Sequence, residues 1–95
     1  MAEEVRFPVY VLAKDCGEFT LFHSLEDMRG YMEAIDVENN EYDVWDAEGF
    51  MLRLIVTDSK KDWLSLRATD AQVSETRLNE ITAQATPYKH SRANR

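Results

Sequence analysis

The chain has 95 residues, of which 44% are apolar, and it carries a formal net charge of −7. This composition is typical of one folded domain and excludes a disordered segment, and no apolar run approaches the roughly 20 residues that span a bilayer. The amino end lacks the regions of a secretory signal and Cys16 is the only cysteine, so we expect a cytoplasmic protein without disulfides. The negative charge argues against direct binding to nucleic acid, whose phosphates it would repel, and no segment indicates binding to a membrane.

Alternating apolar residues near the amino end predict a first hairpin. Residues 6–13 read as a strand, and Pro8, which has no N–H to donate, favours an edge position or the start of that strand. The D-C-G sequence that follows predicts a turn at Gly17, and residues 19–23 supply the partner strand. One face of the first strand should carry Phe7, Val9, Val11 and Ala13.

A helix is predicted to begin after Ser24. The sequence S-L-E-D is a variant of the capping box, in which the Ser24 hydroxyl accepts the N–H of Asp27. Apolar residues follow at three- and four-residue steps, so the last of them, Ile35, is expected in the core. Residues 36–41 break this pattern and are expected to form a loop. The full stripe comprises Leu25, Met28, Met32 and Ile35.

The clearest hairpin joins residues 42–45 to residues 50–57. Its D-A-E-G connector ends in Gly49, which suits the left-handed position of a type I turn with a bulge. After another turn, residues 63–68 are expected to form a fifth strand. The side chains expected to face the core are Phe50, Leu52, Leu54 and Val56 on one strand and Leu64, Leu66 and Ala68 on the next.

A second helix is expected to run to about Gln84. Its start is open, because Thr69, Asp70 and Ser74 are all residue types that cap helices. Its apolar stripe is weaker than that of the first helix, and it comprises Ala71, Leu78, Ile81 and Ala85, with Val73 offset.

Pro87 is expected to end the ordered domain, since proline cannot continue a helix. Residues 1–86 then form a single domain, and residues 87–95 form a basic and flexible tail. The positive charges of this tail are Lys89, Arg92 and Arg95.

Together these elements have the order β-β-α-β-β-β-α and predict a two-layer α+β fold. Strands joined by tight turns pair antiparallel, so we expect a meander sheet of about five strands with two helices on one face. The opposite face would then hold an unusual number of large apolar residues for a surface in water, which indicates either that the inward and outward assignment is wrong in part or that this face meets a partner. These residues are Tyr10, Trp45, Met51, Ile55 and Trp63.

Familiar catalytic and metal-binding patterns are absent from the sequence. The run that begins at Asp36 has alternating oxygen ligands, but Glu41 and Ala47 stand where an EF-hand loop needs glycine and glutamate. Cys16 lies between acids that disfavour a thiolate, and acids in a hairpin tip are usually solvated rather than catalytic. No nucleotide-binding, zinc or hydrolase motif is present. We therefore expect a protein that is not an enzyme and that needs no metal or cofactor.

The acids are concentrated in the middle of the chain. Residues 33–49 contain seven acids and no base, whereas a surface that serves only solubility usually mixes the two signs. Aromatic residues are interleaved with these acids, and tyrosine and tryptophan are enriched in interface hot spots. The predicted partner-binding residues are Glu33, Asp36, Glu38, Glu41, Tyr42, Asp43, Trp45, Asp46 and Glu48.

The stretch SLEDMRGYMEAIDVENNEYDVWDAEGFMLRL at residues 24–54 resembles small bacterial cytoplasmic proteins of uncharacterised function. In size and charge the chain is also similar to the immunity proteins that protect bacteria from toxins. That resemblance implies an inhibitor without catalysis, whose carboxylates occupy the basic groove of a toxin nuclease. It rests on charge and size, without a diagnostic motif, so it assigns no binding residue by position.

Two functional hypotheses follow from these observations. In the first, the acidic residues bind a basic protein, such as a toxin domain, and the carboxylates steer the encounter. In the second, the protein forms a homodimer through the apolar sheet face at Met51, Ile55 and Trp63, and the acids only keep it soluble. An enzyme or small-ligand binder would need a concave pocket, which the sequence does not reveal.

Overall fold

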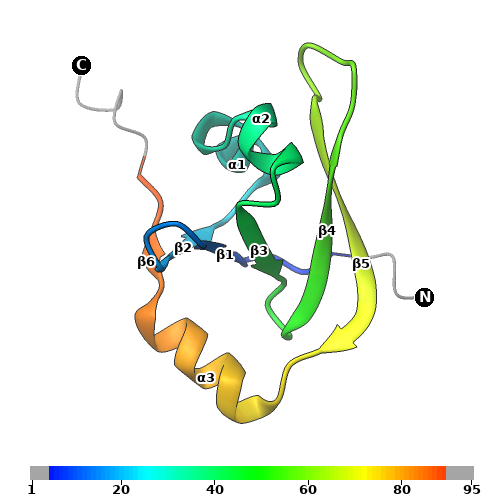
Figure 1. Ribbon diagram of the computed structural model, residues 1–95. Coiled ribbons are helices and arrows are strands. Elements are labelled where there is room, and N and C mark those ends of the chain that lie inside the picture. Colours follow the sequence, from blue (N-terminus) through cyan, green and yellow to red (C-terminus); the bar gives the residue numbers. More distant parts are fainter. Residues whose placement is uncertain (1–4, 90–95) are drawn as a thin grey trace.

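The computed structural model describes residues 5–89, which form a mixed six-stranded sheet with three helices (Figure 1). The predicted α+β class is confirmed. The order of strands across the sheet is β5-β4-β3-β1-β2-β6. The elements are β1 (Val9–Ala13), β2 (Glu18–Phe22), α1 (Leu25–Tyr31), α2 (Ala34–Glu38), β3 (Tyr42–Trp45), β4 (Phe50–Val56), β5 (Leu64–Gln72), α3 (Glu75–Gln84) and β6 (Thr86–Pro87).

Strand β1 lies in the interior of the sheet and pairs antiparallel with β2 on one side and β3 on the other. A simple meander would instead have paired β2 with β3. The chain avoids this pairing because α1 and α2 connect β2 to β3 and carry the chain across β1. Pro8 immediately precedes β1, so its missing N–H removes no bond from either ladder.

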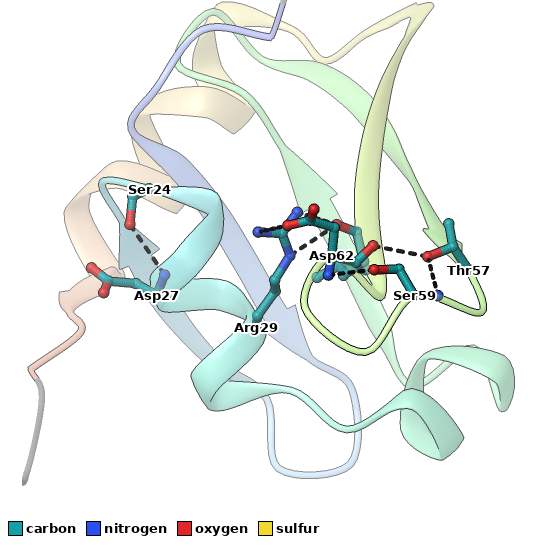
Figure 2. A network of polar contacts seen from close by, with 7 residues as sticks. Ser24, Asp27, Arg29, Thr57, Ser59 and Asp62 are labelled. Carbon is teal, nitrogen blue, oxygen red and sulfur yellow. Dashed lines mark hydrogen bonds and ion pairs between the residues drawn. The ribbon is translucent and has the colours of Figure 1, made fainter.

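Helix α1 begins as the capping pattern predicts. The Ser24 hydroxyl accepts the backbone N–H of Asp27 at 3.1 Å (Figure 2). Met28 and Met32 lie fully inside the first core cluster, between α1 and the sheet. This cluster contains Val9, Val11, Phe22, Met28, Met32, Val44, Leu52 and Leu64.

The prediction that Ile35 lies in the core is wrong, because its side chain is 61% exposed. Helix α1 ends at Tyr31, and Met32 takes an extended conformation. The helical period is therefore interrupted before Ile35, which falls on the outside of the separate helix α2. Residues 36–41 were expected to form a loop, but residues 36–38 belong to α2.

Helix α3 covers the opposite face of the sheet from α1, so the prediction of helices on one face is wrong (Figure 1). Ser74 is the cap of α3, and its hydroxyl accepts the N–H of Arg77 at 3.1 Å. Strand β5 continues to Gln72 and therefore includes Thr69 and Asp70, so neither of these residues can cap the helix. The second core cluster, between α3 and the sheet, contains Tyr10, Phe19, Trp45 and Ile81.

This arrangement explains the apolar face that the sequence left unaccounted for. Tyr10, Trp45 and Met51 pack in the second core cluster beneath α3. Trp63, predicted to point outward, packs instead against the first core cluster. A homodimer through Met51, Ile55 and Trp63 therefore loses most of the surface on which that hypothesis depended.

The ordered domain continues past Pro87, where a tail was expected to begin. Strand β6 pairs parallel with β2, through Thr20 with Thr86 and Leu21 with Pro87. The ring of Tyr88 then lies 5.0 Å from that of Phe22, centroid to centroid. The remaining basic residues predicted for the tail, Arg92 and Arg95, lie outside the described residues.

Candidate functional site

The acidic run at residues 33–49 is divided between two ends of the sheet. Helix α2 and Glu41 lie at the end where β3 begins, and the hairpin tip that holds Asp46 and Glu48 lies where β3 finishes (Figure 1). Strand β3 spans the distance between them. The predicted partner-binding residues therefore do not form one continuous surface.

Two of the predicted contact residues are buried, which corrects their assignment. Trp45 is 5% exposed and packs against Phe19, with 6.2 Å between the ring centroids. Asp46 is 0% exposed, and its Oδ1 accepts the N–H groups of Glu48 at 2.9 Å and Phe50 at 3.0 Å. Asp46 therefore shapes the hairpin turn, and neither side chain reaches a partner in this conformation.

Two further predicted residues are engaged with bases of the same chain. Asp43 lies 3.5 Å from Lys14, and Glu48 lies 3.3 Å from Arg6, as N···O distances. The four side chains of these pairs are 34–53% exposed, so each pair contributes little to stability. They do reduce the local negative charge at both positions.

The remaining acids gather around Tyr42, at the start of β3. The pKa of the Tyr42 phenol is raised to about 12, and burial is the largest cause. The smaller contributions that raise this pKa come, in decreasing order, from Asp36, the Tyr31 phenol, Asp15 and Glu41. These neighbours come from α1, α2, the turn between β1 and β2, and the segment before β3. The backbone agrees, because the N–H of Glu41 donates to the Asp36 carbonyl at 3.1 Å and the N–H of Lys14 donates to the Glu41 carbonyl at 2.9 Å, which brings Asp15, Asp36 and Glu41 to the same end of the sheet.

We define the acidic end as this cluster together with the exposed acids of α2 and its cap. Lys14 donates its backbone N–H to the Glu41 carbonyl at 2.9 Å, which fixes the turn that carries Asp15 beside the segment that carries Glu41. The contribution of Asp15 was missed in the sequence because it depends on this long-range contact. The acidic end comprises Asp15, Glu33, Asp36, Glu38 and Glu41, with Tyr42 among them.

The acidic end also presents an exposed apolar side chain. Ile35 lies in α2 between the acids Glu33 and Asp36, and it is the most exposed large apolar residue in the described part of the chain. Its exposure results from the break between α1 and α2. An apolar contact surrounded by carboxylates is a feature of protein-binding surfaces.

A separate groove of about 510 Å³ runs beside the edge of β2. It exists because β6 pairs with β2 and brings Tyr88 next to Tyr31, with 5.7 Å between their ring centroids. No sequence pattern predicts this pairing, because Thr-Pro has a low propensity to form a strand. Its lining includes one acid and one ammonium group, Glu18 and Lys89, which do not make a nucleophile and base pair.

Neither a metal-ligand cluster nor a membrane-spanning helix occurs among the described residues. Across residues 5–89, no group of three or more His, Cys, Asp or Glu side chains is arranged to hold a metal ion. Among the helices of that same part of the chain, none has the length and apolar character needed to cross a membrane.

Comparisons of the chain with protein-family models, curated proteins and solved structures give no match.

Proposed function

We propose that the protein is a non-catalytic binding module whose acidic end engages a basic surface of another protein. A toxin nuclease is the partner class that fits this chemistry, and the module would then act as an immunity protein. The carboxylates would replace the phosphates that such an enzyme normally binds. The acids around α2 and Tyr42 would make the contact, whereas Trp45 and Asp46 are buried and lie outside it.

The observation that carries the proposal is the convergence of unneutralised carboxylates on Tyr42. None of the five acids of the acidic end forms an ion pair with a base among residues 5–89, whereas Asp43, Glu48, Asp62 and Glu80 do. Unpaired like charges repel one another, so holding them together costs folding free energy. A basic partner would relieve that repulsion.

The acidic end also offers the contact chemistry that binding requires. Carboxylates raise the rate of encounter with a basic protein, but rim charges alone add little affinity. Ile35 and the ring of Tyr42 would supply apolar area that becomes desolvated at the centre of the contact. We expect affinity to fall as salt concentration rises, because the long-range attraction is screened.

The test uses a charge-reversed variant and a control with the same change in net charge. Asp36, Glu38 and Glu41 are replaced by lysine in the first, and the exposed acids Glu26, Asp58 and Asp70 are replaced by lysine in the second. Tagged proteins capture partners from a native lysate, and stopped-flow kinetics then measure association with the partner identified. We expect the first variant to lose the partner through a slower association rate and the control to retain it. Full retention by the first variant would refute the proposal.

A further inference from the structure

The outer face of the β4–β5 hairpin carries two arginines directly opposite each other. Arg53 on β4 and Arg67 on β5 are antiparallel partners in the ladder, and both are exposed. Side chains at directly opposite positions have Cβ atoms about 4.5–5.5 Å apart, and like charges placed there destabilise the sheet. The two guanidinium groups therefore occupy one small area of the surface.

Neither of these arginines has a polar partner in the described part of the chain. Of the five arginines at residues 5–89, the other three, Arg6, Arg29 and Arg77, each form an ion pair with an acid. The chain as a whole has 18 acids and 11 lysines and arginines, so acids are not scarce. The two unpaired arginines are thus adjacent to each other within an acidic protein.

The surroundings leave this pair accessible and do not neutralise it. Helix α3 packs over Tyr10 and Trp45 in the interior of the sheet, and the second core cluster does not include the outer residues of β5. Asp43 lines a cavity of about 270 Å³ together with Arg53 but forms its ion pair with Lys14. Ser65, opposite Ile55, adds a hydroxyl group next to the arginines.

We propose that Arg53 and Arg67 together bind a doubly charged phosphoryl monoester group. A phosphoryl monoester carries about −1.5 to −2 charges at pH 7, which matches two guanidinium groups, and its oxygens accept the paired N–H donors that each guanidinium presents. A nucleic-acid strand would bring further phosphates against a protein of net charge −7, so the match is to an isolated group.

The source of this group is a phosphorylated side chain of an extended protein segment. Both arginine side chains are exposed, so a small phosphate compound held between them would stay largely hydrated. An extended segment would also cover the half-buried side chain of Ile55, which lies on the same face of β4 as Arg53 and opposite Ser65. Arg53 alternates along β4 with Leu52 and Leu54, which contact the first core cluster, and the site uses none of the five acids of the acidic end.

The experiment measures binding to the full chain by NMR titration of backbone amides at low salt. The probes are inorganic phosphate, a five-residue peptide with a central phosphoserine between valines and alanines, and the same peptide without phosphate. We expect shifts centred on Arg53 and Arg67, and an affinity for the phosphopeptide at least tenfold higher than for phosphate. The peptide without phosphate should produce no shift there.

Three double variants distinguish binding by the planar guanidinium groups from binding by positive charge alone. Arg53→Gln with Arg67→Gln should abolish binding, and Lys60→Gln with Lys61→Gln, which removes the same charge from an exposed turn, should preserve it within twofold. Arg53→Lys with Arg67→Lys keeps the charge and should weaken binding about fivefold or more, because lysine lacks the planar fork. The site would be refuted if binding persisted in the Arg53→Gln, Arg67→Gln variant. It would also be refuted if the Lys60→Gln, Lys61→Gln control weakened binding to the same extent as that variant. If the phosphopeptide bound with no higher affinity than inorganic phosphate, a protein segment would be refuted as the source of the phosphoryl group.

Discussion

The guanidinium group of Arg29 donates two hydrogen bonds to the backbone carbonyl of Leu64, from Nε at 3.2 Å and from Nη2 at 2.9 Å. The remaining nitrogen, Nη1, lies 3.3 Å from the Asp62 carboxylate (Figure 2). Arg29 belongs to α1 and Leu64 begins β5, so this single side chain joins the helix to the outermost strand across 35 residues of sequence.

We expect Arg29→Ala to destabilise the protein by about 2–3 kcal/mol, because it leaves the carbonyl of the buried Leu64 without this donor and breaks a hydrogen bond from a charged group. Asp62→Ala should cost less than about 1 kcal/mol, since the Asp62 side chain is 72% exposed and its ion pair is solvated. Urea unfolding followed by tryptophan fluorescence measures both values. Equal losses in the two variants would mean that the ion pair, and not the carbonyl contact, joins α1 to β5.

The sequence predicted the features that depend on neighbouring residues. The Ser24 cap, the hairpin from Tyr42 to Val56 and the left-handed Gly49, at φ 90°, are all confirmed. Each of these is decided within about one turn of chain, where capping and turn geometry dominate. Gly49 is required for a second reason that no local pattern contains, since a Cβ there would lie 3.0 Å from Cγ2 of Val73.

The features that the sequence did not predict depend on contacts between distant segments. The face covered by α3, the pairing of β6 with β2 and the exposure of Ile35 each follow from where the chain crosses the sheet. The same limit applies to the acidic end. Charge counting found Asp36 and Glu41, but it could not separate them from the buried Asp46 or add Asp15 from a remote turn.

The buried carboxylate of Asp46 should be one of the most sensitive positions for stability. Asp46→Ala removes the acceptor of two N–H groups at the hairpin tip, and we expect it to cost about 2–3 kcal/mol. Asp46→Asn keeps one acceptor oxygen in place and should cost clearly less. Glu48→Ala, on the exposed neighbouring residue, is the control and should change stability by less than about 0.5 kcal/mol. Thermal unfolding of the three variants tests this order, and similar melting temperatures for Asp46→Ala and Glu48→Ala would contradict it.

The indole N–H of Trp45 is buried and has no hydrogen-bond partner among the described residues. Trp45→Phe removes this unsatisfied donor while retaining a ring against Phe19, so we expect a loss of less than about 1.5 kcal/mol despite the smaller side chain. Trp45→Ala leaves a large cavity in the second core cluster and should cost about 3–5 kcal/mol. Denaturant unfolding by circular dichroism compares them. A Trp45→Phe variant as unstable as Trp45→Ala would show that the N–H is satisfied in solution.

The acidic end should make folding sensitive to alkaline pH through Tyr42. Its pKa is about 12 in the folded protein, against an ordinary value of 10.0. Between these values the unfolded chain releases the phenolic proton while the folded chain keeps it, so stability falls as pH rises from about 10 to about 12. Below pH 10 both states are protonated and this effect disappears.

We therefore expect Tyr42→Phe to lose less stability than the natural sequence between pH 10 and pH 12, and to show no such difference between pH 7 and pH 9. Asp36→Asn removes the largest electrostatic contributor after burial and should lower the Tyr42 pKa part of the way toward its ordinary value. Phenolate absorbance near 295 nm gives the pKa, and urea midpoints at each pH give the stability. Parallel pH profiles for Tyr42→Phe and the natural sequence would show that the carboxylates do not converge on this hydroxyl in solution, and the acidic end would lose its main physical support.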